Sequence, residues 1–137
     1  MSAGSGPGGD ARTAYQYVLL RCVPVIARAE AVNVGVVVCV PSAGYLAVVR
    51  HVDAVRLGCL RADLDLSAVD TALDHLEALC AGTPDAGPGA GLAPRDRFGI
   101  VAAARSTVVQ PGPVHGGLLA GEDPARVLER LADELVR

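Results

Sequence analysis

Lysine and tryptophan are absent from this sequence of 137 residues, and its aromatic side chains are limited to three tyrosines and one phenylalanine. Without lysine the chain has neither a P-loop lysine nor a Schiff-base lysine, and no G-x-S-x-G or H-E-x-x-H motif occurs. Few aromatic faces are available for stacking nucleic-acid bases. The net charge of −3 also gives no general attraction to nucleic acids or anionic membranes. We therefore expect neither a nucleic acid nor a membrane as a partner.

Disulfide frameworks, zinc sites and membrane spans are also not indicated. The four cysteines are widely spaced with no C-x-x-C pair, and three of them lie in apolar runs, which favours buried, reduced thiols. The three histidines have no ligand spacing. Apolar runs are far shorter than the ~20 residues of a membrane span, and the N-terminus lacks the pattern of a signal peptide. We expect a cytoplasmic protein with no cofactor and no metal ion.

The length matches about one domain, on the usual expectation of ~100–200 residues per domain. Residues 1–12 are rich in Gly, Ser and Pro and are expected to be a disordered tail. The tail contains Gly4-x-Gly6-x-x-Gly9, but no strand precedes this motif and Pro7 interrupts it, so we do not expect a dinucleotide site. Residues 13–137 are expected to form one domain, in which residues 82–94 make a flexible surface loop.

Hydrophobic periodicity predicts an α+β fold. Alternating or continuous apolar runs predict strands, and three- and four-residue spacing predicts helices that begin at a polar cap. The predicted strands cover residues 15–25, 32–40, 45–52 and 98–104, with pairing that continues or resumes at 107–110. The predicted helices run from a cap at Asp53 to Leu60, from Ser67 to Gly82, and onward from Asp123 and Pro124. We expect a mixed or antiparallel sheet of four to five strands with two main helices packed on it.

The segment of residues 105–117 contains the most chemistry. It places a guanidinium, hydroxyls, an amide, an imidazole and three glycines directly after an apolar run, where folds often position recognition groups. Such groups can bind an anion or a peptide terminus, or move a proton. The alternative interpretation is an ordered surface turn whose side chains satisfy backbone groups. The candidate residues are Arg105, Ser106, Thr107, Gln110 and His115.

A second group of candidates precedes and opens the valine-rich run. Arg21 lies among apolar neighbours, where an unpaired guanidinium is costly to bury, so it requires Glu30 or a bound anion as its partner. Asn33 starts a turn or bulge at residues 33–35 whose backbone amides can be exposed. The alternative interpretation is that Arg21 and Glu30 pair only to hold one strand against the next.

Four parts of the chain, spread over roughly residues 14 to 136, together resemble a known family. They are Tyr15-Gln16-Tyr17 leading to Arg21-Cys22-Val23-Pro24, Glu30 with Asn33-Val34-Gly35-Val36, Asp96-Arg97-Phe98, and the 105–117 segment. In these parts the chain resembles the DUF3037 family of small bacterial domains of unknown function. The resemblance implies almost nothing about activity. It does imply a protein partner, because genes of this family are expected beside genes of HipA-like kinases.

Two functions remain open. The first is a non-catalytic binding or accessory module that recognises an anionic ligand, a peptide or a partner protein through a polar Arg/Ser/Thr/Gln/His loop, with a homodimer as another possibility. The second is a small transferase or hydrolase in which His115 is the general acid or base and Arg105 stabilises negative charge. The enzyme requires both side chains to face one cavity. The apolar excess also predicts an exposed apolar patch that marks an interaction surface.

Overall fold

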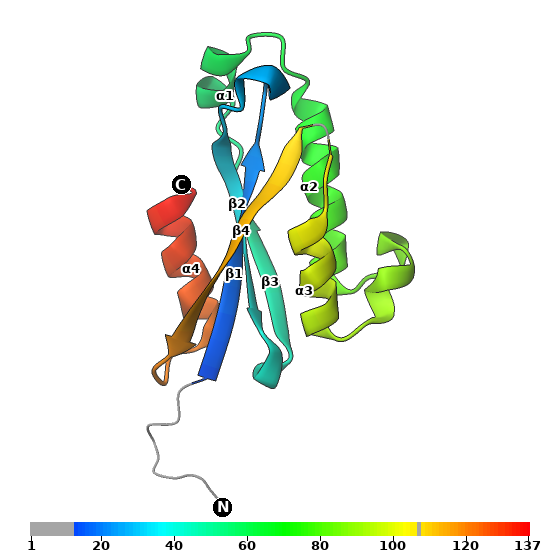
Figure 1. The fold of residues 1–137 in the computed structure, drawn as a ribbon, viewed down its shortest axis with the longest axis vertical. Helices are drawn as coiled ribbons and strands as arrows, with labels where there is room; N and C mark the ends of the chain where they lie inside the picture. The colour runs from blue at the N-terminus through cyan, green and yellow to red at the C-terminus, as the bar shows by residue number, and fades with distance from the viewer. Residues whose placement is uncertain (1–12, 107) are drawn as a thin grey trace, which may run out of the picture.

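The computed structural model describes residues 13–106 and 108–137 and shows an α+β fold. Four antiparallel strands form one open sheet in the order β3-β2-β1-β4. Helices α2 and α3 lie on one side of this sheet and α4 lies on the other (Figure 1). The strands are β1 (Thr13–Cys22), β2 (Val32–Val40), β3 (Tyr45–Arg50) and β4 (Val109–Leu119). The helices are α1 (Ala54–Leu60), α2 (Leu66–Ala81), α3 (Pro94–Ala103) and α4 (Pro124–Leu135).

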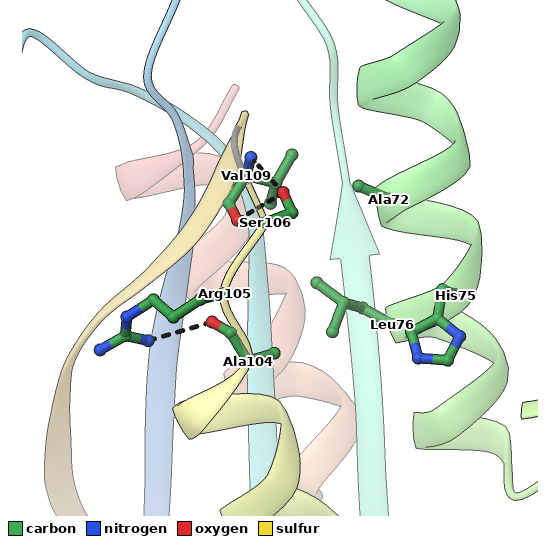
Figure 2. A pocket seen from close by; sticks show the side chains of 7 residues that line it. All are labelled: Ala72, His75, Leu76, Ala104, Arg105, Ser106 and Val109. Atoms are coloured by element: carbon green, nitrogen blue, oxygen red, sulfur yellow. Dashed lines mark hydrogen bonds between the residues drawn. The ribbon is translucent and has the colours of Figure 1, made fainter. Parts of the chain in front are cut away.

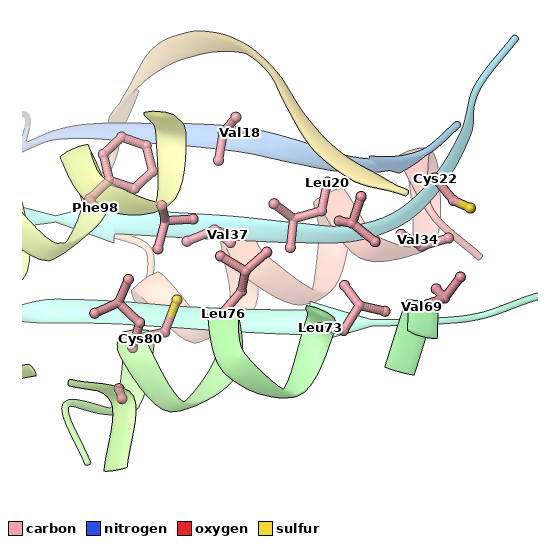
Figure 3. Close-up of a cluster of buried hydrophobic side chains, with 14 of the residues drawn as sticks. Val18, Leu20, Cys22, Val34, Val37, Val69, Leu73, Leu76, Cys80 and Phe98 are labelled. Atoms are coloured by element: carbon pink, nitrogen blue, oxygen red, sulfur yellow. The ribbon is translucent and has the colours of Figure 1, made fainter. Parts of the chain in front are cut away.

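Strand β2 is the centre of the core, because both of its faces are covered. Val37 and Cys39 face α2 and α3, while Val36, Val38 and Val40 face α4. Such two-sided burial explains why this strand consists almost entirely of valine. The buried side chains thus form two clusters, one on each face of the sheet. Figure 3 shows the cluster on the face covered by α2 and α3, with side chains of the sheet opposite those of α2 and Phe98. The two clusters pack the sheet between its helices.

Three of the helices begin at aspartate caps. Asp53 and Asp123 cap α1 and α4 as the sequence predicts, and Pro124 is the first residue of α4. The predicted start of the long helix at Ser67 is wrong, because the Asp65 side chain accepts hydrogen bonds from the backbone amides of residues 67 and 68. The end at Gly82 is confirmed, and this glycine has the left-handed conformation that favours glycine, with φ of 73°.

The strand predicted over residues 98–104 is wrong, because these residues belong mostly to α3. Pro94 occupies the first turn of this helix, where its missing N–H costs nothing. Phe98 and Val101, three residues apart, are the buried side chains of α3. A short apolar run can form either a buried strand or a helix, and the helical spacing decides here.

The polar segment at residues 105–117 is not one loop, which corrects the expectation from the sequence. From residue 109 onward it forms β4, an outer strand of the sheet. Prolines are tolerated in outer strands because one side of the strand needs no ladder hydrogen bonds. Gly112 and Pro113 together oppose the single residue Leu19, which makes a bulge in β4.

Four short 3-10 turns lie in the connections, namely Ile26–Arg28, Pro41–Ala43, Pro84–Ala86 and Pro88–Gly91. The last two lie in the predicted loop of residues 82–94, where Ala86 and Ala90 are buried against the core. The predicted tail at residues 1–12 lies outside the described residues. Among the helices that the structure describes, none has the length and apolar composition needed to cross a membrane.

Candidate functional site

Three polar residues lie side by side on neighbouring strands of the sheet, near the end of β1. Arg21 of β1 is the cross-strand partner of Asn33 in β2 and of Gln110 in β4. Cross-strand partners point to the same face of a sheet, and here that face is the one that carries α4. A bulge at Val34, next to Asn33, brings this row into register. The fold therefore gathers three of the residues that the sequence indicated.

The Arg21 side chain lies across β4 over Gly112. A Cβ atom added to Gly112 would lie 3.3 Å from Nε and 3.4 Å from Cζ of Arg21, so the absence of a side chain at residue 112 makes room for the guanidinium. The Nε atom is buried, and within residues 13–106 and 108–137 it has no hydrogen-bond partner. A buried donor without an acceptor costs free energy. An acceptor from outside satisfies Nε only when the Arg21 side chain shifts and exposes this atom.

Arg21 and Gln110 line a depression of about 200 Å³ on this surface. The other lining residues are small or apolar and come from the connection between β1 and β2. They are Val23, Ile26, Ala29 and Ala31. A guanidinium and an amide beside an apolar wall can recognise a carboxylate that is carried on an apolar group.

A second depression of about 340 Å³ adjoins the first, since both are lined by Val23 and Ile26. Arg61 lies in its wall and donates hydrogen bonds to the carbonyl of Pro24 at 3.1 Å and to the Asp63 carboxylate at 3.0 Å. This region was not predicted from the sequence. No local signal indicates it, because its lining residues come from three separate segments of the chain.

Glu30 does not pair with Arg21. Its carboxylate accepts a hydrogen bond of 2.7 Å from Nε of Arg28 on the exposed surface. This hydrogen bond, together with the positive charge of Arg28, lowers the pKa of the Glu30 carboxyl group. Glu30 is therefore held by a neighbour two residues away, and it does not hold one strand against the next.

Asn33 has a structural contact. Its side-chain amide donates a hydrogen bond of 2.9 Å to the backbone carbonyl of Leu135, in the last turn of α4. The last carbonyls of a helix lack partners within the helix. Asn33 thus satisfies one of them and fastens the end of α4 to β2.

Ser106 organises the entry into β4. Its Oγ accepts hydrogen bonds from the backbone amides of Val108 and Val109, and it donates to the carbonyl of Val109 at 3.0 Å. These contacts agree with the interpretation of this part of the segment as an ordered turn. Thr107, the other predicted hydroxyl, lies outside the described residues.

Arg105 and His115 are held by different neighbours. Nη1 of Arg105 donates to the carbonyl of Ala104 at 3.0 Å, and Figure 2 shows the guanidinium turned away from His75 of α2. The depression that Figure 2 shows is small, about 100 Å³, and mostly apolar. His115 is exposed and stacks on Tyr17 on the α4 face, with ring centroids 5.0 Å apart. The described residues therefore do not join Arg105 and His115 in one cavity.

The role of Arg97 was also not predicted from the sequence. Its Nη1 donates to the carbonyls of Leu79 and Cys80 at the end of α2, and its Nε donates to the carbonyl of Leu92. A signal was present in the Asp96-Arg97-Phe98 motif. Arg97 holds the backbone at the end of α2 and before α3, and Phe98 next to it is part of the core.

Comparison with known proteins identifies the family. A family model described as a protein of unknown function (DUF3037) matches residues 17–136. Comparisons with curated proteins and with solved structures found no significant match. The matched region includes Arg21, Asn33, Arg97 and Gln110, and it confirms the resemblance seen in the sequence. This chain therefore belongs to the DUF3037 family.

Proposed function

We propose that this protein is a non-catalytic binding module that recognises a carboxylate of a peptide or partner protein through Arg21. The single observation that carries the proposal is the buried Nε of Arg21, which has no acceptor among the described residues. When the Arg21 side chain shifts and exposes Nε, a bound carboxylate supplies that acceptor and can bond a second nitrogen of the same guanidinium. Gln110, the cross-strand partner of Arg21, lies beside it as a further polar contact.

The size of the depression favours a group on a macromolecule over a free metabolite. Pockets for small molecules usually enclose about 300–1,000 Å³, and they bury most of the ligand. The Arg21 depression is about 200 Å³. That volume suits one side chain or one chain terminus, while the adjoining depression of about 340 Å³ offers space for a neighbouring residue of the same segment. Ile26, which is 55% exposed, lies between them as an apolar contact.

The chemistry of the walls favours a carboxylate on an apolar body. Val23, Ile26 and two alanines provide apolar surface, and Arg21 provides the positive charge. Examples of such a ligand are a C-terminal apolar residue and a glutamate on an apolar helix. A HipA-like kinase, the partner implied by the family resemblance, is the first protein to test for a segment of this kind.

The alternative enzyme function lacks a comparable observation. It requires a proton-transferring group and an anion-stabilising group at one cavity. His115 stacks on Tyr17, and Arg105 bonds its own neighbouring carbonyl. A binding role therefore accounts for more of the described geometry.

Peptide binding tests the proposal. We would measure, by calorimetry, the affinity of a short apolar peptide with a free C-terminal carboxylate and of the same peptide with a C-terminal amide. The free carboxylate is expected to bind at least about tenfold more tightly, since an Arg–carboxylate pair contributes on that order. Arg21→Leu should remove the difference.

Arg28→Leu is the matched control, because Arg28 is a neighbouring arginine that is exposed and already paired with Glu30. It should leave the preference for the carboxylate intact. Equal affinities for the two peptides, or a preference that survives Arg21→Leu, would contradict the proposed function.

A further inference from the structure

The outer strand β4 lacks the usual protection against pairing with another strand. Outer strands normally carry charged residues or prolines, or are covered by another element. Strand β4 has no charged residue, and its prolines at 111 and 113 lie in its first half only. In the second half, Val114 is 46% exposed and Leu118 is 55% exposed. Residues 114–119 therefore present an apolar strand edge that can accept a further strand.

The opposite edge of the sheet is different. Helix α2 packs on β3 from one side and α4 packs on it from the other. Arg50 at the end of β3 is held by carboxylates of α2, among them Asp74 and Glu77. The residues of β3 are all partly buried and the strand ends in a charged residue, so this edge offers less apolar surface to a further strand. The contrast points to β4 as the edge at which the sheet can be extended.

We propose that two copies of this chain pair through β4 in antiparallel orientation, around a two-fold axis at Gly116. Such pairing is isologous, so the segment must be complementary to itself. Side chains of paired strands point to the same face, which restricts the pairing to even residues opposite even residues and odd opposite odd. With the axis at Gly116, Val114 of each copy lies opposite Leu118 of the other. Each of these exposed apolar side chains is then covered by its partner in the other copy, and the symmetry produces this contact twice.

Other registers lose this match. An axis at His115 would place Val114 opposite Gly116, and an axis at Gly117 would place Val114 opposite Ala120. Only the axis at Gly116 pairs the two exposed apolar residues of this strand with each other. The strand carries no charge, so no like charges meet at the axis.

The glycines of β4 leave space at the proposed contact. A Cβ atom added to Gly116 would meet only the Tyr15 carbonyl oxygen, at 3.6 Å, which is an ordinary contact. Gly117 lies beneath the Tyr15 ring. In the proposed register Gly117 faces His115 of the second copy, so the stack of Tyr15, Tyr17 and His115 would continue across the axis.

Pairing would give an eight-stranded sheet with both copies of α4 on the same side, because the axis is perpendicular to the sheet. Arg21 pairs with the first half of β4, far along the strand from Gly116, so dimer formation and anion binding are separable. An interface of about five residue pairs, between residues 114–118 of each copy, is small compared with standard interfaces of about 1,600 Å². We therefore expect a dimer that dissociates on dilution.

Charge substitutions at the axis test the proposal. The wild type is expected to approach twice its mass of 13.9 kDa as its concentration rises in sedimentation experiments. Gly116→Glu and Gly116→Lys should each raise the dissociation constant by about tenfold or more, since identical charges then face each other. An equimolar mixture of the two variants should form a heterodimer, which also shows that both are folded. Thr71→Glu, on the exposed surface of α2, is the control and should not change the dissociation constant.

Cross-linking provides an independent measurement of the register. Directly opposed strand residues have Cα atoms about 4.5–5.5 Å apart, within the range that a disulfide bridges. Gly116→Cys in a Cys59→Ser background should form a covalent dimer on mild oxidation, whereas Thr71→Cys in the same background should not. Three results would overturn the proposal: a wild type that stays monomeric at all concentrations, a dimer that Gly116→Glu does not weaken, and variants of opposite charge that do not recombine.

Discussion

Arg97, beside the end of α2, and Arg21, near the end of β1, are both partly buried, but their hydrogen bonding differs. Arg97 donates three hydrogen bonds to backbone carbonyls at 2.9–3.2 Å. Arg21 has a buried Nε with no acceptor among the described residues. Both arginines lie in segments that resemble the family. Residue type and family membership therefore do not separate a structural arginine from one that is available to a ligand, whereas the hydrogen-bond partners do.

The largest effect is expected for Arg97→Ala. This change leaves three carbonyls without their charged donor and should lower the free energy of unfolding by about 3 kcal/mol. Urea denaturation measures it, and Arg95→Ala is the matched control on the exposed surface of the same helix, expected within about 0.5 kcal/mol of the wild type. If both variants lose the same stability, Arg97 is not the structural arginine of the comparison.

Asn33 provides a second test of the comparison near the end of β1. It lies opposite Arg21, and its side chain is fixed by a hydrogen bond to the carbonyl of Leu135. Asn33→Ala should cost about 1 kcal/mol through loss of the hydrogen bond to Leu135. In an Arg21→Leu background, in which no guanidinium lies opposite residue 33, Asn33→Asp should cost about 2 kcal/mol, since a carboxylate would face a carbonyl and the negative end of α4. Thermal unfolding of the two variants gives the order. A more stable aspartate variant would show that the contact with α4 does not form.

The buried thiol of Cys80 should make stability depend on pH at the end of α2, where the carbonyl of Cys80 accepts a hydrogen bond from Arg97. Burial raises the pKa of its thiol to about 12, against the opposing charge of Arg97. The unfolded chain releases this proton near the ordinary pKa of 9.0, so stability is intact below that pH and declines as the pH rises toward the folded pKa. We expect a loss of about 1 kcal/mol from about pH 8 to about pH 10. Cys80→Ala should show a smaller decline over the same interval, and an unchanged decline would assign the effect to other groups.

The smallest change in stability is expected for Arg21→Leu. Leucine keeps part of the apolar stem and removes a buried donor that has no acceptor, so the free energy of unfolding should stay within about 0.5 kcal/mol of the wild type or rise. The same urea experiment applies. A loss as large as that of Arg97→Ala would make Arg21 a structural residue and would remove the basis of the comparison.

Local signals in the sequence predicted much of the fold. The valine run at residues 32–40 and the Asp123-Pro124 start of α4 are strong signals, because two-sided burial and helix capping act on neighbouring residues. Residues 98–104 could not be assigned from their short apolar run alone, since Pro94 sets the helix from outside that run. The prolines of β4 suggested a loop, and only its place at the edge of the sheet makes a strand with these prolines acceptable.

The candidate site was predicted in part. An arginine among apolar residues already indicates a need for a partner, which is why Arg21 could be named from the sequence. Its neighbour Gln110 follows from the register of β1 and β4, and that register depends on a bulge that no local pattern encodes. Arg21 and Arg28 were both available as partners for Glu30, and the carboxylate pairs with Arg28, which is only two residues away in the chain.

The Nε–H resonance of Arg21 tests the central claim most directly. Nitrogen-15 spectra of the arginine side chains would be recorded during titration with acetate at constant ionic strength, with Arg21→Leu to assign the signal. The account predicts a saturable shift of the Arg21 Nε–H signal to the position of a hydrogen-bonded donor, while the signal of Arg97, which already bonds the Leu92 carbonyl, stays in place. No saturable shift at Arg21, or equal shifts at both arginines, would contradict a carboxylate site at Arg21.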